Sequence, residues 1–430
     1  MQVFEEPSKQ DWEALLQRPN FEAAELLPKV QSILDAVALE GDAALLRFSA
    51  TFDQVQLKSL CIDPVLIQAA EVLVAPALKT AIQSAKVNIE IFHQAQLKKE
   101  EKIETMPGVW CWRKSVGIEK VGIYIPGGTA PLFSTVLMLG VPAKLAGCKE
   151  VILCTPPRKD GTVDPAILYA AGLVGIQQIY TIGGAQAIAA MAYGTATVPK
   201  VFKIFGPGNQ YVTAAKQLVQ QQGVAIDMPA GPSEVCVYAD ETAVPSFVAA
   251  DLLSQAEHGA DSQVLLIASS SNFVEQVQLE LVNQLTNLPR ADFATKALGH
   301  SKAIVIASRE DAIQLINAYA PEHLILSVDN ALVVAEKIIN AGSVFIGNYS
   351  PESVGDYASG TNHTLPTNGY AKAYSGVSVD SFVKKITFQQ LTEMGLKNIA
   401  QTVIQMASGE QLEAHAHAVA IRVKDIESKM

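Results

Sequence analysis

From Val121 onward, short apolar runs rich in β-branched residues alternate with segments of helical composition. The first series of runs is VGIYI, VILC, QIYTI, VFKIF and VAIDM, and a second series includes EVCVYA, QVLLIAS, AIVIAS, HLILSV and SVFIG. The runs are apolar throughout, as expected for parallel strands that are buried on both faces. The two series share a rhythm but not a sequence. The pattern therefore predicts an α/β chain with two doubly wound units in tandem.

Composition narrows the classes of protein that fit this pattern. Of the 430 residues, 49% are hydrophobic and 17% are charged, a balance that excludes a disordered or coiled-coil protein. Lys and Arg total 32 against 43 Asp and Glu, and no stretch concentrates basic residues, so we expect no nucleic-acid partner. The five cysteines form no C-x-x-C pair, which argues against a disulfide framework or a thiolate zinc site.

The segment Val121–Ala143 contains no charged side chain and has to be weighed as a membrane span. Pro126, Pro131 and Pro142 divide it, however, so it predicts a strand, a turn and a helix instead. The acidic N-terminal sequence lacks a basic region followed by an apolar core, so we see no secretory signal. We therefore expect no membrane contact and a cytoplasmic location.

Three glycine-containing turns lie between a predicted strand and a predicted helix: IPGGTAP at 125–131, IGGAQA at 182–187 and GPGNQY at 206–211. Each could offer backbone N–H groups to an anion. GPGNQY resembles the dinucleotide fingerprint, but Tyr211 occupies its third glycine position. Because the carboxyl ends of parallel strands lie along one edge of a sheet, the three turns should converge on one crevice and bind a cofactor.

Two pairs of polar residues have the spacing of functional groups. Gln255 and His258 are three residues apart near the end of a predicted helix, so both lie on one face and could ligate Zn²⁺. The alternative is a polar helix end with a surface histidine near the negative dipole. Glu322 and His323 precede an apolar strand and could serve as two proton acceptors. Their alternative is a loop histidine beside a solvated glutamate.

A Gly-, Ser-, Thr- and Asn-rich segment at 347–376 is too long for an ordinary connection, and we expect it to be functional rather than disordered. Near the C-terminus, His415 and His417 point to different sides of a predicted helix, so at most one should reach any given site. Cys148 and Cys154 flank an apolar run with no histidine beside them, and we predict packing roles rather than a nucleophile.

Longer motifs occur in a fixed order: VGIYIPGGTAPLFSTVLMLGVPAKLAGCKEV, GGAQAIAA, KIFGPGN, IDMPAGPSEV, LLSQAEHG, PEHL and GDYASGTNH. Together they resemble the histidinol dehydrogenase family, from about residue 25 to the end. The resemblance implies oxidation of L-histidinol through L-histidinaldehyde to L-histidine, with two NAD⁺ and one Zn²⁺ per subunit. It also implies an intertwined homodimer of two incomplete Rossmann-like domains with small N-terminal and C-terminal helical segments.

The resemblance assigns roles to residues of this chain. The implied zinc ligands are Gln255, His258, Asp356 and His415. His415 fits the family pattern H-x-x-A-V better than His417 does. In similar proteins this histidine and the acid matching Glu410 reach the site from the other subunit.

The same resemblance makes Glu322 and His323 the catalytic acid–base pair. Implied substrate-binding residues are Ser233 and His363, together with Gln255, His258, His323, Asp356, Glu410 and His415. Tyr124, Gln186 and Asn209 match positions that contact NAD, one near each glycine turn.

We expect the first α/β domain, which carries the metal and substrate site, to comprise residues 26–122 and 236–376. Residues 123–235 should form the second α/β domain, with the NAD-contacting turns. An N-terminal helical arm at 1–25 and a C-terminal helical tail at 377–430, which reaches the partner subunit, complete the expected organisation.

Two other functions remain open from the sequence. Relatives of this family oxidise other small alcohols such as sulfopropanediol, although His363 and Glu410 fit the histidinol pattern. A metal-dependent hydrolase could use the same ligand set to activate water. The three glycine turns favour a dehydrogenase over that alternative.

Overall fold

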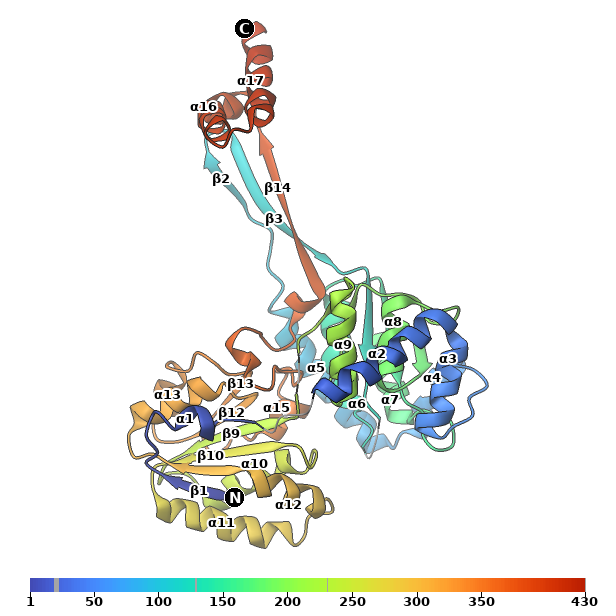
Figure 1. The fold of residues 1–430 in the computed structure, drawn as a ribbon, viewed down its shortest axis with the longest axis vertical. Helices are drawn as coiled ribbons and strands as arrows, with labels where there is room; N and C mark the ends of the chain where they lie inside the picture. The colour runs from blue at the N-terminus through green and yellow to red at the C-terminus, as the bar shows by residue number, and fades with distance from the viewer. Residues whose placement is uncertain (19–22, 128–129, 230, 430) are drawn as a thin grey trace. The chain divides into compact units, whose positions relative to one another are not determined.

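A computed structural model describes residues 1–18, 23–127, 130–229 and 231–429. The chain divides into two compact units (Figure 1). Unit 1 comprises Met1–Gln96 and Ile118–Ser381, and unit 2 comprises Leu97–Gly117 and Phe382–Met430. Unit 1 contains two parallel sheets with helices around them, which confirms the predicted α/β fold class.

The larger sheet of unit 1 has six parallel strands in the order β1-β11-β10-β9-β12-β13. Their bounds are β1 Gln2–Glu5, β9 Glu234–Ala239, β10 Gln263–Ala268, β11 Lys302–Val305, β12 His323–Ser327 and β13 Ser343–Ile346. Every residue of β9, β10 and β12 is buried, which explains why their sequences are mostly apolar after the polar first residue of each strand. Apart from β1, the strand order is the 3-2-1-4-5 of a doubly wound sheet.

Each face of this sheet packs on its own core. Val235, Val237 and Ala239 of β9 belong to the core shared with α10, α11 and α12, whereas Cys236 and Tyr238 belong to the core shared with α13 and α14. The bounds of these helices are α10 Pro245–Ala256, α11 Ser271–Leu285, α12 Ala291–His300, α13 Arg309–Tyr319 and α14 Ala331–Ala335. Successive side chains of a strand point to opposite faces, so one apolar run serves two cores.

The smaller sheet of unit 1 has five parallel strands in the order β6-β5-β4-β7-β8. The strands are β4 Lys120–Tyr124, β5 Glu150–Thr155, β6 Gln178–Thr181, β7 Lys203–Phe205 and β8 Ala225–Ile226, joined by α6 Phe133–Leu145, α7 Pro165–Val174, α8 Gly184–Tyr193 and α9 Gln210–Gln221. Every residue from Ser134 to Ala143 is buried in α6, so the uncharged segment forms a strand and a core helix, as predicted.

The N-terminal helices differ from the predicted domain organisation. They are α2 Ala23–Glu40, α3 Asp42–Phe48, α4 Pro64–Leu73 and α5 Pro76–Gln94. The expected first domain combines residues 26–122 with residues 236–376, but α2 packs on α8 and α9, α4 on α7, and α5 on α6. Val30 and Leu34 of α2 share a core with Tyr124 of β4. An amphipathic helix shows which face it buries but not which sheet receives it, and this explains the wrong grouping.

Residues 1–18 are also not a purely helical arm. β1 pairs with β11 as an edge strand, and only the short helix α1, Trp12–Leu15, follows it. The predicted loop at 347–376 contains a helix as well, α15 Glu352–Tyr357. Three short helices are not α-helical: the π-helix η1 Ser49–Asp53 and the 3₁₀ helices η2 Tyr370–Lys372 and η3 Val379–Phe382.

Unit 2 is a three-stranded antiparallel sheet with two helices at one end of its long strands (Figure 1). It comprises β2 Lys102–Met106, β3 Val109–Gly117, β14 Val383–Leu391, α16 Glu393–Gly409 and α17 Glu413–Ser428. The prediction of a helical tail is correct for α16 and α17 and wrong for β14. β14 pairs with β3 along all of its nine residues, so a partner distant in sequence fixes its conformation.

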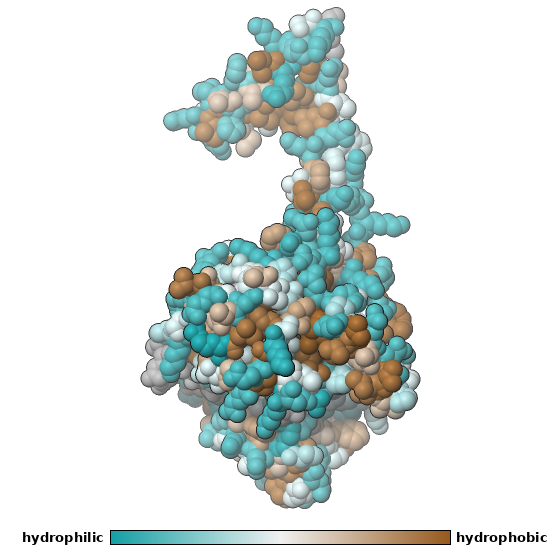
Figure 2. Space-filling view, turned by 90° about the vertical axis from the view of Figure 1, so that its right-hand side faces the viewer, coloured by the Kyte–Doolittle hydropathy of each residue, from teal (hydrophilic) through white to brown (hydrophobic). Residues whose placement is uncertain are grey.

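Polar side chains cover much of the visible surface of unit 1, with apolar patches between them (Figure 2). Among the described residues, no single helix has both the length and the apolar character needed to cross a membrane. Within the described ranges, α4 and α5 are the one helix pair that meets those criteria together, and the pair is bent by 113° at its break.

Candidate active site

The candidate site is centred on His323, the first residue of β12, whose imidazole is surrounded by acidic side chains. Its Nδ1 lies 3.6 Å from Glu322 Oε2 and 3.8 Å from Glu352 Oε1, and its Nε2 lies 3.5 Å from Asp356 Oδ1. The side chain of His323 is only 4% exposed. Unit 1 therefore gathers three carboxylates around one buried imidazole.

Glu352 and Asp356 both come from α15. They are four residues apart, so a single helical face directs both carboxylates at His323. Asp356 was predicted as a site residue and Glu352 was not. The signal that could have revealed Glu352 is the spacing of two acids in PESVGD, but the same spacing is common on solvated helix faces.

Gln255 reaches this cluster from the last turn of α10 and is fully buried. With its amide oriented to satisfy both neighbours, its nitrogen donates to Glu352 Oε1 at 2.6 Å and its oxygen accepts from the Glu234 backbone N at 2.9 Å. The same backbone N–H donates to Glu322 Oε2 at 2.9 Å. Gln255 is thus hydrogen-bonded between α15 and the first residue of β9.

The charges of the cluster perturb one another. Burial lowers the pKa of His323, but the carboxylates of Glu352 and Glu322 act against it and raise the pKa well above its usual value. Burial raises the pKa of Glu352 to about 8. Burial would also raise the pKa of Asp356, but its contact with His323 prevails and lowers it. The site has an excess of buried negative charge, which a proton or a bound cation would neutralise.

The donor atoms fit a cation. His323, Glu352 and Asp356 each offer a ligand atom, and these atoms lie within 4.8 Å of one another. His323 Nε2, Glu352 Oε2 and Asp356 Oδ1 are buried without a hydrogen-bond partner in the described part of the chain. Buried polar atoms without partners are costly, and a metal ion would satisfy them. Imidazole nitrogen and carboxylate oxygen both suit Zn²⁺.

This cluster overlaps only in part with the predicted ligand set. Asp356 belongs to both, and Gln255 touches the cluster through Glu352. His258 is close enough for its charge to act on Asp356. Glu410 and His415 are exposed residues of unit 2, so unit 1 alone does not contain them.

A cleft of about 290 Å³ adjoins Glu322 and contains the predicted substrate residues Ser233, His258 and His363 in its lining. His363 is fixed at both ring nitrogens: Nε2 contacts Thr135 Oγ1 at 3.0 Å and Nδ1 contacts the Asp356 backbone O at 2.8 Å. Burial lowers the pKa of His363, although Asp356 acts against this change.

A second cleft, of about 630 Å³, contains Tyr124, Gln186 and Asn209, the three predicted NAD-contacting residues. The Tyr124 hydroxyl accepts a hydrogen bond from the Gly184 backbone N at 3.0 Å, and burial raises the pKa of Tyr124 to about 12. The three glycine turns therefore meet at one edge of the five-stranded sheet, as expected. Gly128 and Thr129 of the first turn and Ala230 of the PAGPSEV motif lie outside the described residues.

Asn209 lines both clefts. It also begins α9, because its side-chain oxygen accepts from the backbone N–H groups of Tyr211 and Val212. The cleft that contains the predicted NAD contacts and the cleft that Glu322 lines thus share a wall.

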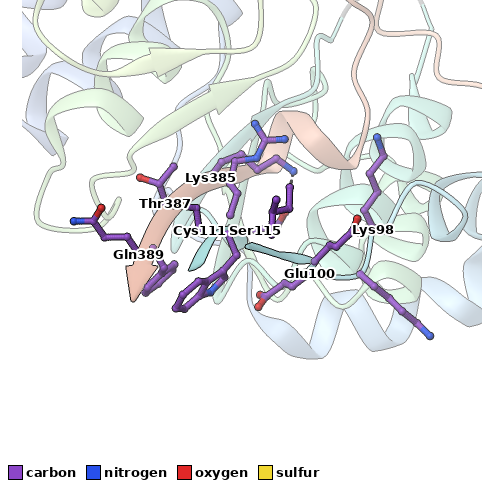
Figure 3. A pocket seen from close by; sticks show the side chains of 13 residues that line it. Lys98, Glu100, Cys111, Ser115, Lys385, Thr387 and Gln389 are labelled. Atoms are coloured by element: carbon purple, nitrogen blue, oxygen red, sulfur yellow. Dashed lines mark hydrogen bonds between the residues drawn. The ribbon is translucent and has the colours of Figure 1, made fainter. Parts of the chain in front are cut away.

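A larger hollow, of about 720 Å³, lies within unit 2 and contains none of the predicted site residues (Figure 3). Lys98, Glu100 and Lys385 line it beside β3 and β14, and Trp112 and Phe388 stack at 5.3 Å. Its charges are mixed, and it contains no group of three metal-ligating side chains among the described residues. It does not compete with the site in unit 1.

The cysteines support the predicted packing role. Cys154 is fully buried in β5, and burial raises the pKa of its thiol. Burial also raises the pKa of Cys148, to about 11. Neither thiol lines one of the clefts, and a nucleophilic cysteine needs a lowered pKa.

Comparisons with known proteins agree on one family. The family described as histidinol dehydrogenase matches residues 16–423. The histidinol dehydrogenase of Bacteroides thetaiotaomicron is 59% identical over 426 residues, covering 99% of this chain and 100% of that protein. The enzyme of Bacteroides fragilis is 57% identical over the same length. The crystal structure of histidinol dehydrogenase from Elizabethkingia anophelis has a TM-score of 0.97 at 56% identity and covers 99% of both chains.

Proposed function

Because this chain belongs to the histidinol dehydrogenase family, an NAD-dependent oxidoreductase family, we propose that it oxidises L-histidinol to L-histidine through L-histidinaldehyde. Both oxidations, with two NAD⁺ and one zinc ion, would occur at the single site around His323. The observation that carries the proposal is the buried His323, whose imidazole lies 3.6 Å from Glu322 and 3.5 Å from Asp356, in a chain 59% identical to the histidinol dehydrogenase of Bacteroides thetaiotaomicron.

Zinc would be held by Gln255, His258 and Asp356 of one subunit and by His415 of the partner subunit. The unpartnered Asp356 Oδ1 supports this set, and the Gln255 carbonyl keeps a second lone pair when it accepts from Glu234. Glu352 would orient the Gln255 amide by accepting its N–H. Bound zinc supplies a template for the amino alcohol, and bound NAD⁺ supplies the hydride acceptor.

His323 would take the alcohol proton at Nε2 in the first oxidation. Its Nδ1 faces the Glu234 backbone O at 3.2 Å, and a carbonyl can only accept, so the proton of neutral His323 belongs on Nδ1. Nε2 has no hydrogen-bond partner among the described residues, so it is the atom left to accept a proton.

Glu322 would activate a water molecule that adds to the aldehyde in the second oxidation. One of its oxygens accepts from the Glu234 backbone N, and the residue also lines the 290 Å³ cleft. An anchored carboxylate at the wall of the substrate cleft can bind and orient water there. Ser233 and His363 would line the substrate, while Tyr124, Gln186 and Asn209 would contact NAD⁺.

The active species would be a homodimer, because Glu410 and His415 belong to unit 2 and are proposed to complete the site of the partner subunit. We propose a cytoplasmic location for it. The exposure of both side chains in a single chain is consistent with this role.

The test is NADH formation, followed by absorbance, on mixing the protein with L-histidinol and NAD⁺. We expect activity that a chelator abolishes and added zinc restores. Sulfopropanediol should give no comparable rate. Absence of NADH formation with histidinol, under conditions where the dimer is intact and zinc is bound, would refute the proposal.

Two variants separate the half-reactions. His323→Asn should suppress oxidation of histidinol with little loss of zinc, and normal turnover would exclude His323 as the base. Glu322→Gln should impair oxidation of supplied histidinaldehyde, and an unchanged aldehyde rate would exclude Glu322 as the group that activates water.

A further inference from the structure

Arg18, which follows α1, forms a bidentate ion pair with Glu234, the first residue of β9. Arg18 Nε lies 2.5 Å from Glu234 Oε2, and Nη2 lies 2.9 Å from Oε1. The Glu234 side chain is 2% exposed. The guanidinium also lies over the Tyr319 ring, 4.0 Å from its centroid, and donates to the Tyr319 backbone O at 2.8 Å. Four contacts therefore fix the position of one arginine.

The backbone of Glu234 touches three residues of the candidate active site. Its N–H donates to Glu322 Oε2 and to the Gln255 amide oxygen, both at 2.9 Å. Its carbonyl O faces His323 Nδ1 at 3.2 Å. Glu234 thus binds Arg18 through its side chain. Through its main chain it contacts both proposed acid–base residues and one proposed zinc ligand.

We propose that Arg18 is a positioning residue of the active site, acting through Glu234. This inference rests on the proposed function of Glu322 and His323. The bidentate geometry matters because two parallel hydrogen bonds fix both the position and the rotation of the Glu234 carboxylate. With that side chain fixed, the peptide groups at the start of β9 stay aligned with β12.

Loss of Arg18 would leave the Glu234 carboxylate buried next to a second acid without its cation. An uncompensated buried charge is strongly destabilising, so the side chain would turn toward water and move the start of β9. The hydrogen bond to His323 Nδ1 would then weaken, and Nε2 would no longer be the defined proton acceptor. Glu322 would lose its backbone donor in the same movement.

The remainder of the N-terminal segment is anchored to the same sheet. β1 pairs with β11, and Lys302 of β11 donates to the Leu15 backbone O. Arg18 therefore extends from a segment that is itself bound to the six-stranded sheet. Both residues of the ion pair, Arg18 and Glu234, are thus anchored to the same sheet.

The experiment measures kcat, its pH profile, and the KM values for histidinol and for NAD⁺ in Arg18→Lys and Arg18→Met. A displaced acid–base pair should lower kcat by about ten- to a hundredfold in Arg18→Met while KM for NAD⁺ stays unchanged. Arg18→Lys keeps the positive charge but cannot form the bidentate pair with Glu234. It should therefore fold, retain zinc and have a kcat between those of Arg18→Met and the wild-type protein. The shape of the pH profile separates a positioning role from a structural one, because a smaller folded fraction lowers kcat without changing that shape.

Arg47→Met is the matched control, because Arg47 also forms an ion pair, with Glu40 at 2.9 Å, but at an exposed position. It should leave kcat and the pH profile unchanged. Glu234→Gln should reproduce the effect of Arg18→Met, and the double variant should be no worse than the more impaired single variant, because both remove one interaction.

A wild-type kcat and pH profile in folded Arg18→Lys and Arg18→Met would overturn the inference. So would fully additive losses in the double variant. If wild-type protein itself makes no NADH from histidinol, the proposed function fails instead, and the two failures are therefore distinguishable.

Discussion

Replacing Lys216 by methionine should destabilise the smaller sheet and weaken NAD⁺ binding. Lys216 of α9 and Asp227, which follows β8, form an ion pair whose side chains are 4% and 1% exposed. The pair also holds both polar groups of the Gly206 backbone. Lys216 Nζ donates to the Gly206 O at 3.0 Å, and Asp227 Oδ2 accepts from the Gly206 N at 2.8 Å.

The loss in free energy of unfolding depends on how well the buried Asp227 carboxylate is compensated once Lys216 is replaced. Breaking a buried ion pair by removing one partner costs about 3–5 kcal/mol, because the other charge stays buried. Asp227 would keep its bonds from the backbone N–H groups of Gly206 and Met228, and Lys203 lies close enough to interact with it. These contacts offset part of the loss, so we expect the free energy of unfolding to fall by about 3 kcal/mol, at the low end of that range.

The assay is urea unfolding followed by circular dichroism, together with KM for NAD⁺. KM should rise because the turn that Lys216 holds ends at Asn209, in the wall of the larger cleft. Lys149→Met is the control, since Lys149 pairs with Glu119 at 3.3 Å on the surface, and it should cost less than about 1 kcal/mol. The double variant Lys216→Met with Asp227→Leu should be more stable than Lys216→Met alone. Equal unfolding free energies for Lys216→Met and Lys149→Met would refute the reasoning.

Two further predictions concern groups outside the acid–base pair. Cys148→Ala and Cys154→Ala should leave kcat unchanged, with a loss of about 1 kcal/mol in unfolding free energy for the buried Cys154; a large fall in kcat would show that a thiol takes part. Burial raises the pKa of Asp251 to about 7, so the folded protein retains a proton that the unfolded chain loses. The free energy of unfolding should therefore fall as pH rises from about 4 to 7, by up to about 1.4 kcal/mol per pH unit, and Asp251→Asn should flatten that slope in urea titrations; parallel pH profiles for the two proteins would contradict it.

The sequence predicted the strands well because burial on both faces imposes uniformly apolar runs. β9, β10 and β12 are read directly from EVCVYA, QVLLIAS and HLILSV. The sequence of an amphipathic helix does not indicate which sheet it packs on, so α2 to α5 were assigned to the wrong sheet. β14 was missed because its conformation depends on pairing with β3, more than 250 residues away in the chain.

The candidate site was predictable to a similar degree. Glu322 and His323 are adjacent in sequence, so both lie at the start of β12. The glycine turns follow parallel strands of one sheet, so they lie at the same edge of that sheet. Glu352 and Arg18 carried no comparable signal. Glu352 becomes distinctive only when α15 brings its carboxylate to 3.8 Å from His323 Nδ1, and Arg18 only when its side chain meets the buried carboxylate of Glu234.

The two sheets have the same strand order but contribute opposite ends to the site. In the five-stranded sheet, the turns after β4, β6 and β7 line the larger cleft at the carboxyl ends of the strands, where doubly wound sheets usually bind ligands. In the six-stranded sheet, Glu234 and Glu322 lie at the amino ends of β9 and β12.

The 290 Å³ cleft lies between the carboxyl edge of the five-stranded sheet and the amino edge of the six-stranded sheet. Gly208 and Asn209 line it from the first edge, and Ser233 and Glu322 from the second. A rule that places ligands at carboxyl ends therefore finds the proposed NAD cleft and misses the proposed acid–base pair. At the amino ends of β9 and β12, buried side chains, the hydrogen-bonded peptide of Glu234 and the Arg18 ion pair supply the rigidity.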